Sequence, residues 1–172
     1  MKPTILFSTL IVMAALAAPF ESFAVDAERQ AEVAQRGAEV MPFSLKATTH
    51  IFTKSDDGGS QQVIAKNTAD SVQIRLIREH LRGIQTQFQR GDFSGPARTH
   101  GTDMPGLAQL RAAKPGQIWI TYEDIKGGGE LTYRCDDPKL VASLHEWFDA
   151  QLSDHGADAM DGHVHHQGMT QP

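Results

Sequence analysis

The sequence is poor in cysteine, because Cys135 is the only one among its 172 residues. A single cysteine excludes any disulfide within the chain, so the fold must depend on its apolar core. Free cysteines are more often buried than reactive, and we expect Cys135 to point inward beside Leu131 and Tyr133 on one strand. A thiolate metal ligand is the functional alternative for this residue.

The short motifs of hydrolases and nucleotide-binding enzymes are also absent. The chain has no G-x-S-x-G, P-loop, G-x-G-x-x-G or H-E-x-x-H segment, so the chemistries that depend on them have no support. Its formal net charge is −5 with scattered lysines, which offers no footprint for nucleic acid. We therefore lean away from an enzyme and expect no nucleic-acid partner.

Long apolar runs are absent except near the N-terminus, where Ile5–Ala18 follows Lys2 and precedes Ser22-Phe23-Ala24. Small residues three and one before a cut are what signal peptidase accepts, and the run is short for a bilayer span. We predict a cleaved export signal, with an uncleaved anchor as the alternative. The mature chain would be periplasmic or secreted, off the membrane, and long enough for one domain.

Two similar halves follow along the chain. Alternating apolar and polar residues predict a strand in 41–54, a turn at Ser55–Gly59 and a returning strand. Asp70 then caps a helix that stops at Gly91. The second half repeats this order. It has a strand, a KGGG turn, a returning strand and then a helix capped by Asp137.

This pattern predicts the α+β class. The expected architecture has two layers, a four-stranded antiparallel sheet with two helices on one face, built as β-β-α twice. The predicted parts are a signal peptide (1–24), an N-terminal lead (25–40), the α+β domain (41–156) and a His-rich disordered tail (157–172). The lead could be a short helix or frayed. The tail has no apolar pattern to bury, so its removal after Gly156 should leave folding intact.

Histidines in the predicted helices are the main candidates for chemistry. Helical spacing turns His80, His145 and His155 toward the core side. A buried imidazole needs a partner for each ring nitrogen, and a metal, a carboxylate or a carbonyl can serve. One such histidine is more often structural than a ligand, but three on two packed helices favour a shared site, into which His80 and His145 would both point.

The long segment between the halves supplies a second candidate. His100 and Met104 lie four residues apart within Gly91–Gly116, and imidazole with thioether suits copper better than zinc or magnesium. The structural alternative is that Met104 fills a core gap while His100 is solvated. His50 is expected on the strand face opposite Phe43, either exposed there or covered by this segment.

Several motifs together resemble a known family. They are MPFSLKATTHIFTK, IREHL, GDFSGPARTHGTDMPGL, ITYEDIKGGGELTY and DDPKLVASLHEWFDAQLSDHG. The sequence resembles a family of small exported proteobacterial proteins without established activity, sometimes labelled aspartate carbamoyltransferase. The resemblance implies that the histidines of these motifs and Met104 belong to the family pattern. The enzyme label is rejected, because that enzyme needs two α/β domains and an S-T-R-T-R phosphate loop, which this chain lacks.

These observations predict a periplasmic metal-binding protein for copper, with zinc as the second ion, in storage, delivery or tolerance. The expected ligands in the domain are His50, His80, His100, Met104, His145 and His155. The tail would be an auxiliary chelator through His163, His165, His166 and Met169. The expected partners are the metal ion and an envelope protein. Two alternatives stay open: a metal-independent envelope binding module with structural or pH-responsive histidines, and a small His-dependent enzyme.

Overall fold

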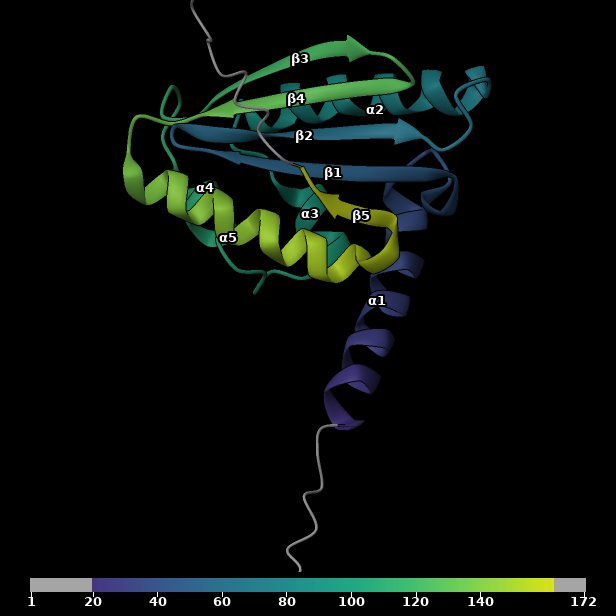
Figure 1. The fold of residues 1–172 in the computed structure, drawn as a ribbon. Helices are drawn as coiled ribbons and strands as arrows, with labels where there is room; N and C mark the ends of the chain where they lie inside the picture. The colour runs from purple at the N-terminus through teal and green to yellow at the C-terminus, as the bar shows by residue number, and fades with distance from the viewer. Residues whose placement is uncertain (1–19, 163–172) are drawn as a thin grey trace, which may run out of the picture.

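A computed structural model describes residues 20–162 of the chain (Figure 1). Two short 3-10 turns, η1 (Leu45–Ala47) and η2 (Gly156–Asp158), accompany the regular elements. The helices and strands follow in the order α1 (Phe20–Val40), β1 (Thr48–Ser55), β2 (Gly58–Ala65), α2 (Ser71–Phe88), α3 (Ser94–His100), α4 (Leu107–Ala112), β3 (Trp119–Ile125), β4 (Gly128–Arg134), α5 (Pro138–His155) and β5 (Ala159–Asp161). Within residues 20–162, no helix is both long and apolar enough to cross a bilayer.

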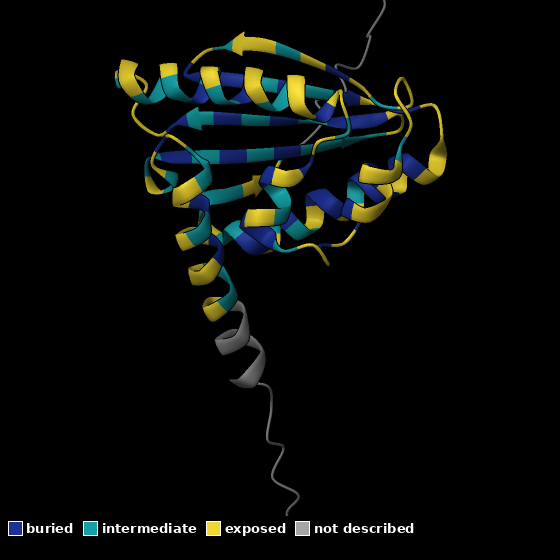
Figure 2. Ribbon diagram, turned by 180° about the vertical axis from the view of Figure 1, so that it is seen from behind, coloured by how far each residue is buried: buried dark blue, intermediate teal, exposed yellow. Residues whose placement is uncertain are grey.

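The five strands form one mixed sheet in the order β3-β4-β2-β1-β5. The four long strands pair antiparallel, whereas β5 pairs parallel with β1. Side chains alternate across the sheet, so one face is buried and the other is more open to solvent (Figure 2). Both α2 and α5 cover the buried face of the sheet. Leu81 of α2 packs at Gly129 of β4, and Phe148 of α5 packs on Phe52 of β1. The strand register places Gly129 and Phe52 on the same face.

The helix boundaries follow from local chemistry. Asp70 accepts a hydrogen bond from the Gln73 amide at 3.0 Å, which satisfies one of the unpaired N–H groups at the start of α2. Asp137 does the same for α5 through the Lys139 amide, with Pro138 at the first position. The α5 helix ends at Gly156, whose φ of 52° suits glycine.

The α+β class and the repeated β-β-α order are confirmed, but the finer architecture differs. The sheet has five strands rather than four, and one pair is parallel. Besides α2 and α5, residues 20–162 contain three further α-helices. The lead at 25–40 is helical, because it lies within α1, where Val33 is fully buried against the domain.

The predicted tail boundary at 157 lies too early. Residues 159–161 form β5, and the Gly162 amide donates to the Phe52 carbonyl. This segment was missed because a three-residue strand carries no detectable alternation, so only its pairing with β1 defines it. The predicted chelating residues of the tail, 163–172, and the predicted signal up to residue 19 lie outside the described residues.

The face assigned to His50 is also corrected. The 3-10 turn η1 (Leu45–Ala47) separates Phe43 from the strand, so alternation restarts at Thr48. His50 and Phe52 therefore point to the buried face, and Ile51 points to the other. Of the two alternatives for His50, cover by the segment that carries His100 is correct. This contact lies on the sheet face that the helices occupy, not on the opposite face.

Candidate functional site: a histidine-lined pocket

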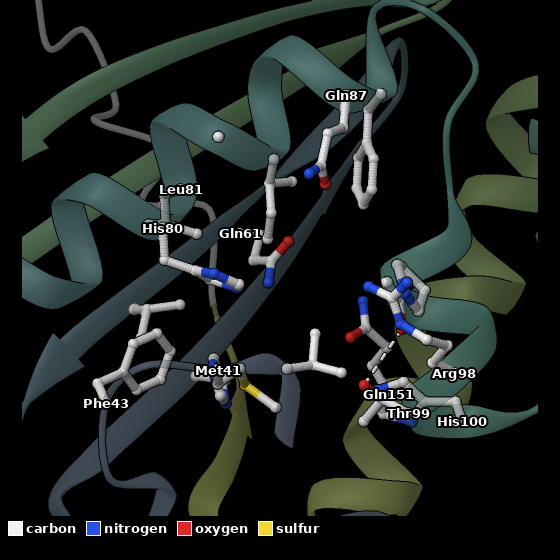
Figure 3. A pocket seen from close by; sticks show the side chains of 18 of the residues that line it. Met41, Phe43, Gln61, His80, Leu81, Gln87, Arg98, Thr99, His100 and Gln151 are labelled. Carbon is white, nitrogen blue, oxygen red and sulfur yellow. Dashed lines mark hydrogen bonds between the residues drawn. The ribbon is translucent and has the colours of Figure 1, made fainter. Parts of the chain in front are cut away.

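A pocket of about 410 Å³ opens on the buried face of the sheet (Figure 3). Strands β1 and β2 contribute to its wall, as do α2, α3, α5 and the segment after α1. Its polar lining residues include His50, Gln61, His80, Arg98, Thr99, His100, Trp147, Gln151 and His155. Its apolar wall includes Met41, Phe43, Val63, Leu81, Ile84 and Phe88. The cavity lies in the range typical of small-ligand sites.

Four of the five histidines of the predicted domain line this pocket. The ring centroids of His50 and His155 are 4.6 Å apart, and those of His100 and His155 are 5.1 Å apart. His155 thus lies between the other two. His80 approaches from α2, with its ring edge-on to Phe43 at 5.5 Å. Helix α5 provides His155, strand β1 provides His50, and the end of α3 provides His100.

Burial keeps much of this cluster uncharged. Desolvation lowers the pKa of His80 and His155 to about 4, and it lowers the pKa of His50 well below its ordinary value. The neighbouring imidazoles act in the same direction on His50, because two positive charges would repel each other. These three rings are therefore neutral at pH 7, which is the form that carries a lone pair for a metal or a proton.

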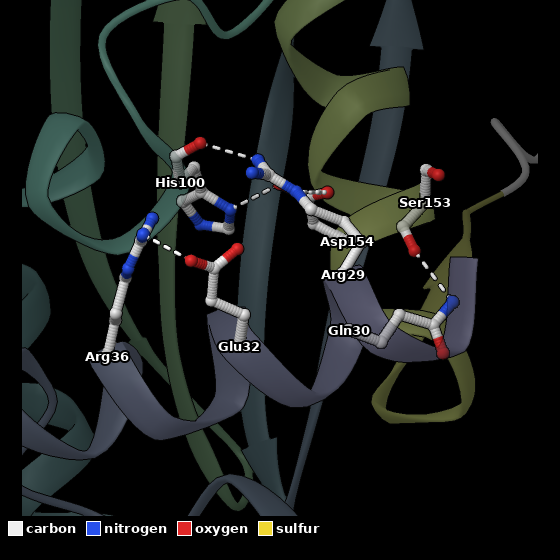
Figure 4. A network of polar contacts seen from close by, with 7 residues as sticks. All are labelled: Arg29, Gln30, Glu32, Arg36, His100, Ser153 and Asp154. Atoms are coloured by element: carbon white, nitrogen blue, oxygen red, sulfur yellow. Dashed lines mark hydrogen bonds and ion pairs between the residues drawn. The ribbon is translucent and has the colours of Figure 1, made fainter. Parts of the chain in front are cut away.

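His100 is held by an ionic network that reaches the N-terminal helix (Figure 4). Its Nδ1 donates to Asp154 at 2.8 Å, and Arg29 of α1 donates twice to the same carboxylate at 2.9 Å. Burial acts to raise the pKa of Asp154, but the bonds from His100 and Arg29 hold it at about 2. In the neutral ring this arrangement leaves the lone pair on Nε2, as it does in histidines that ligate metals.

Three polar atoms in the pocket wall have no hydrogen-bond partner among residues 20–162 and are shielded from solvent. They are His50 Nδ1, Trp147 Nε1 and Gln151 Nε2. An unpaired buried polar group costs about 1–3 kcal/mol, and such groups are rare in folded domains. All three of these unpaired side-chain atoms lie in the wall of one pocket. A ligand bound in the pocket could supply the missing hydrogen-bond partners.

Two predicted ligands lie elsewhere. The Nε2 of His145 donates to the Gly58 carbonyl at 2.8 Å, with the Ser55 carbonyl at 3.2 Å. It therefore braces the β1–β2 turn, because it projects from the side of α5 rather than from its pocket face. Met104 is buried in the hydrophobic core and does not line the pocket. The structural alternative is correct for Met104, whereas His100 is buried rather than solvated.

The predicted burial of Cys135 is confirmed. Its side chain packs with Leu140 and Val141 in a small cluster outside the pocket. Burial, together with nearby aspartates, raises the pKa of its thiol to about 11. A thiol in that state is neither a ready nucleophile nor a ready metal ligand at neutral pH.

Several pocket residues were not found from the sequence. Trp147 and Gln151 lie eight and four residues before the predicted His155, on the same face of α5, a spacing that could have revealed them. Met41 is a second thioether, and it lines the pocket in place of Met104. The Gln61 side chain has the same inward parity as Val63 and Ala65 on β2. Asp154 and Arg29 have no such signal, because their sequence separation is 125 residues.

The cluster meets some conditions for a metal site and not others. Two imidazoles on one tetrahedral ion have ring centroids about 5 Å apart, given metal–nitrogen bonds near 2.0–2.1 Å, and two pairs here have that spacing. Within residues 20–162, however, no three His, Cys, Asp or Glu side chains are placed to hold one ion together. In this arrangement an ion would be limited to two such ligands.

Comparisons with known proteins add no further constraint. No family model matches the chain, and the searches of curated proteins and of solved structures returned no match either. The fold and the pocket therefore carry the functional argument alone.

Proposed function

We propose that this chain is an exported metal-binding protein that takes copper in the histidine pocket, for storage, delivery or tolerance. The observation that carries the proposal is the convergence of His50, His100 and His155, with ring separations of 4.6 and 5.1 Å, inside one buried pocket. These residues come from three elements that are distant in sequence. Histidine imidazole is the commonest metal ligand in proteins, and three imidazoles converge here.

Copper is preferred over zinc because of the remaining donor. Met41 lines the same pocket, and Figure 3 shows its thioether among the wall residues. Thioether sulfur selects Cu(I), whereas imidazole alone accepts zinc, copper or nickel. Asp154 would act behind His100 by fixing the ring and its tautomer. Zinc stays the competing ion, because it needs only the imidazoles.

Binding with three ligands would require modest movement of side chains. Turning one side chain about 30° from its preferred rotamer costs roughly 0.5–1.5 kcal/mol. Structural zinc ions in zinc-finger peptides contribute roughly 10–16 kcal/mol of apparent binding free energy at pH 7. The cost of the rotation is therefore small beside the free energy of metal binding. Two histidines at their present spacing would bind the ion first, and the third ring would then turn toward it.

The alternative of pH-responsive histidines is less well supported for this pocket. A switch near neutral pH needs an imidazole that titrates there. The pKa values of His80 and His155 are about 4, so these rings would change charge only in strongly acidic conditions. A metal-independent binding role is compatible with the same pocket and is separated by the experiment that follows.

The test uses protein purified without an affinity tag and truncated after Gly162, so that the tail cannot bind metal. Cu(I) affinity is measured by competition with a chromophoric chelator, and Zn(II) affinity is measured in parallel. His155→Ala is expected to weaken both ions about tenfold or more, because it removes the middle ring of the cluster. Met41→Leu is expected to weaken Cu(I) and leave Zn(II) unchanged.

The matched control is His145→Ala, which removes a histidine of the same helix that lies outside the pocket. It should leave both affinities unchanged while circular dichroism shows a folded protein. Failure of the truncated protein to bind either ion would overturn the proposal. Equal losses for the two alanine variants would overturn the assignment of the site.

A further inference from the structure

The pocket contains more than its histidines can explain. Its volume of about 410 Å³ far exceeds that of a single ion, and its far wall is apolar, with Phe43, Leu81 and Phe88. Pockets of about 300–1,000 Å³ with apolar walls and a few polar groups are typical of small organic ligands. The polar groups away from the histidines therefore define what kind of ligand fits.

Those groups are hydrogen-bond donors. The indole Nε1 of Trp147 can only donate, and it has no partner among the described residues. The same holds for Gln151 Nε2, one helical turn along α5. Across the pocket, Gln61 Oε1 accepts from the Tyr133 hydroxyl at 3.0 Å, which orients its amide and leaves its N–H₂ group to donate. Figure 3 shows Gln61 and Gln151 projecting into the pocket.

A metal cation cannot satisfy these donors, because they need an acceptor. A carbonyl or carboxylate oxygen would pair with them. Trp147 is 1% exposed and Gln151 is 5% exposed, so their polar atoms lie just behind the pocket surface. An oxygen that accepts from these donors on binding would relieve the cost of leaving them unpaired.

The charge at the mouth favours an anionic oxygen. Arg98 of α3 lines the pocket, is exposed, and forms no ion pair within the described part of the chain. Glu79 also lines the pocket, but Arg75 pairs with it. Arg29 and Asp154 neutralise each other. Arg98 therefore supplies the unpaired charge beside the donors, and its guanidinium matches a carboxylate in shape.

We infer that the pocket binds a small organic carboxylate with an apolar body. The carboxylate would accept from Trp147, Gln151 and Gln61 and face Arg98, while the body would lie against the apolar wall. The histidine cluster at the other end of the helix face is not needed for this binding. The inference therefore goes beyond the proposed metal site and can fail or hold independently of it.

The test uses the chain stripped of metal with a chelator and carrying Trp119→Phe. The sequence has two tryptophans, so this substitution leaves Trp147 as the only tryptophan, which is excited selectively at wavelengths where tyrosine does not absorb. Trp119 itself is exposed outside the pocket. The probes are phenylacetate and hexanoate, with phenylacetamide and hexanamide as neutral counterparts. Trp147 emission and titration calorimetry report binding. The carboxylates are expected to bind about tenfold tighter than the amides.

Variants locate the binding. Arg98→Gln should weaken the carboxylates about tenfold and leave the amides unchanged, and Gln151→Leu should weaken both classes. The matched control is Arg111→Gln, which removes an arginine outside the pocket that also forms no ion pair within residues 20–162. Arg98 and Arg111 are both exposed, so these two variants are expected to fold normally, as circular dichroism would verify.

The outcomes separate this inference from the metal proposal. Absence of binding by all four probes overturns the carboxylate site, even if copper binds normally. Carboxylate binding that ignores Arg98 and Gln151 places the ligand elsewhere and also overturns it. Binding that occurs only after copper is added would make the carboxylate a co-ligand of the metal, which contradicts an independent site.

Discussion

At the residue scale, the chemistry of the pocket depends on which histidines have protein partners. His145 donates to backbone carbonyls of a turn, and His100 donates to Asp154. His50 has an unpaired Nδ1 among the described residues, and desolvation keeps it neutral. Residues of one type, with similar inward positions in the sequence, thus have different roles. The partner of each ring, rather than its burial alone, separates a structural histidine from a candidate ligand.

Asp154→Asn tests the residue that supports His100. The change removes the negative charge that pairs with Arg29 and accepts from His100. We expect the free energy of unfolding to fall by about 1–3 kcal/mol and copper affinity to fall about 10–100-fold. Chemical denaturation and chelator competition measure the two effects.

Asp149→Asn is the matched control on the same helix. Asp149 pairs with Lys54 at the surface, with its side chain 60% exposed, so its loss should change stability by less than about 1 kcal/mol. It should also leave copper affinity unchanged. Equal behaviour of the two variants would show that the Asp154 network contributes neither to the fold nor to the site.

At the scale of elements, short segments assemble the pocket around the long ones. The two β-β-α halves supply the sheet, α2 and α5. Helix α3 then brings His100 and Arg98 to the pocket, and α1 fixes α3 and α5 through Arg29. Strand β5 covers the edge of β1 beside His50, with which Ala159 pairs. These additions turn a two-layer scaffold into one with a partly enclosed cavity.

Truncation at two points tests the role of β5. Removal of residues after Gly156 deletes the strand, the Lys66–Asp158 ion pair and the bond from the Gly162 amide to Phe52. We expect this truncation to lower the free energy of unfolding by roughly 1–3 kcal/mol, because several backbone hydrogen bonds are lost. Removal of residues after Gly162 should have little effect. Urea denaturation of both chains measures the difference, and equal midpoints would contradict a structural role for β5.

At the scale of the whole molecule, the pocket histidines make the free energy of unfolding depend on pH. Three histidines have pKa values lowered by burial in the folded state. In the unfolded chain they would regain ordinary values near 6.5. Between about pH 6.5 and pH 4 the unfolded state therefore binds more protons, so the folded state loses stability as the pH falls. Above pH 6.5 this contribution is fully present.

The prediction is a steep fall in stability on acidification from pH 6.5 to pH 4. Each such histidine contributes at most about 1.4 kcal/mol per pH unit within this window. His155→Gln should flatten the profile by up to that slope, because the group no longer titrates. Asp154, with its pKa lowered from 3.8 to about 2, adds to this fall only at its acidic end, below about pH 5. Denaturation midpoints across pH measure the profile, and identical slopes for variant and parent would contradict the prediction.

The sequence by itself determined the class of fold and most long elements of this protein. Turn residues, caps and alternation are local signals, so α2, α5 and the two hairpins were predictable from Asp70, Asp137 and the glycine-rich turns. The inward positions of His80 and His155 followed from helical spacing alone. These features depend on neighbours a few residues away.

Only the tertiary structure decided which of these residues meet. The 3-10 turn before β1 reversed the face of His50, and the pairing of β5 extended the domain past Gly156. His145 and His155 lie 10 residues apart on α5 and project from different sides of the helix. The packing of α5 therefore places His145 at the β1–β2 turn and His155 in the pocket. The contact between Arg29 and Asp154 spans 125 residues. Such contacts arise from packing of distant elements, for which the local pattern of the chain carries no signal.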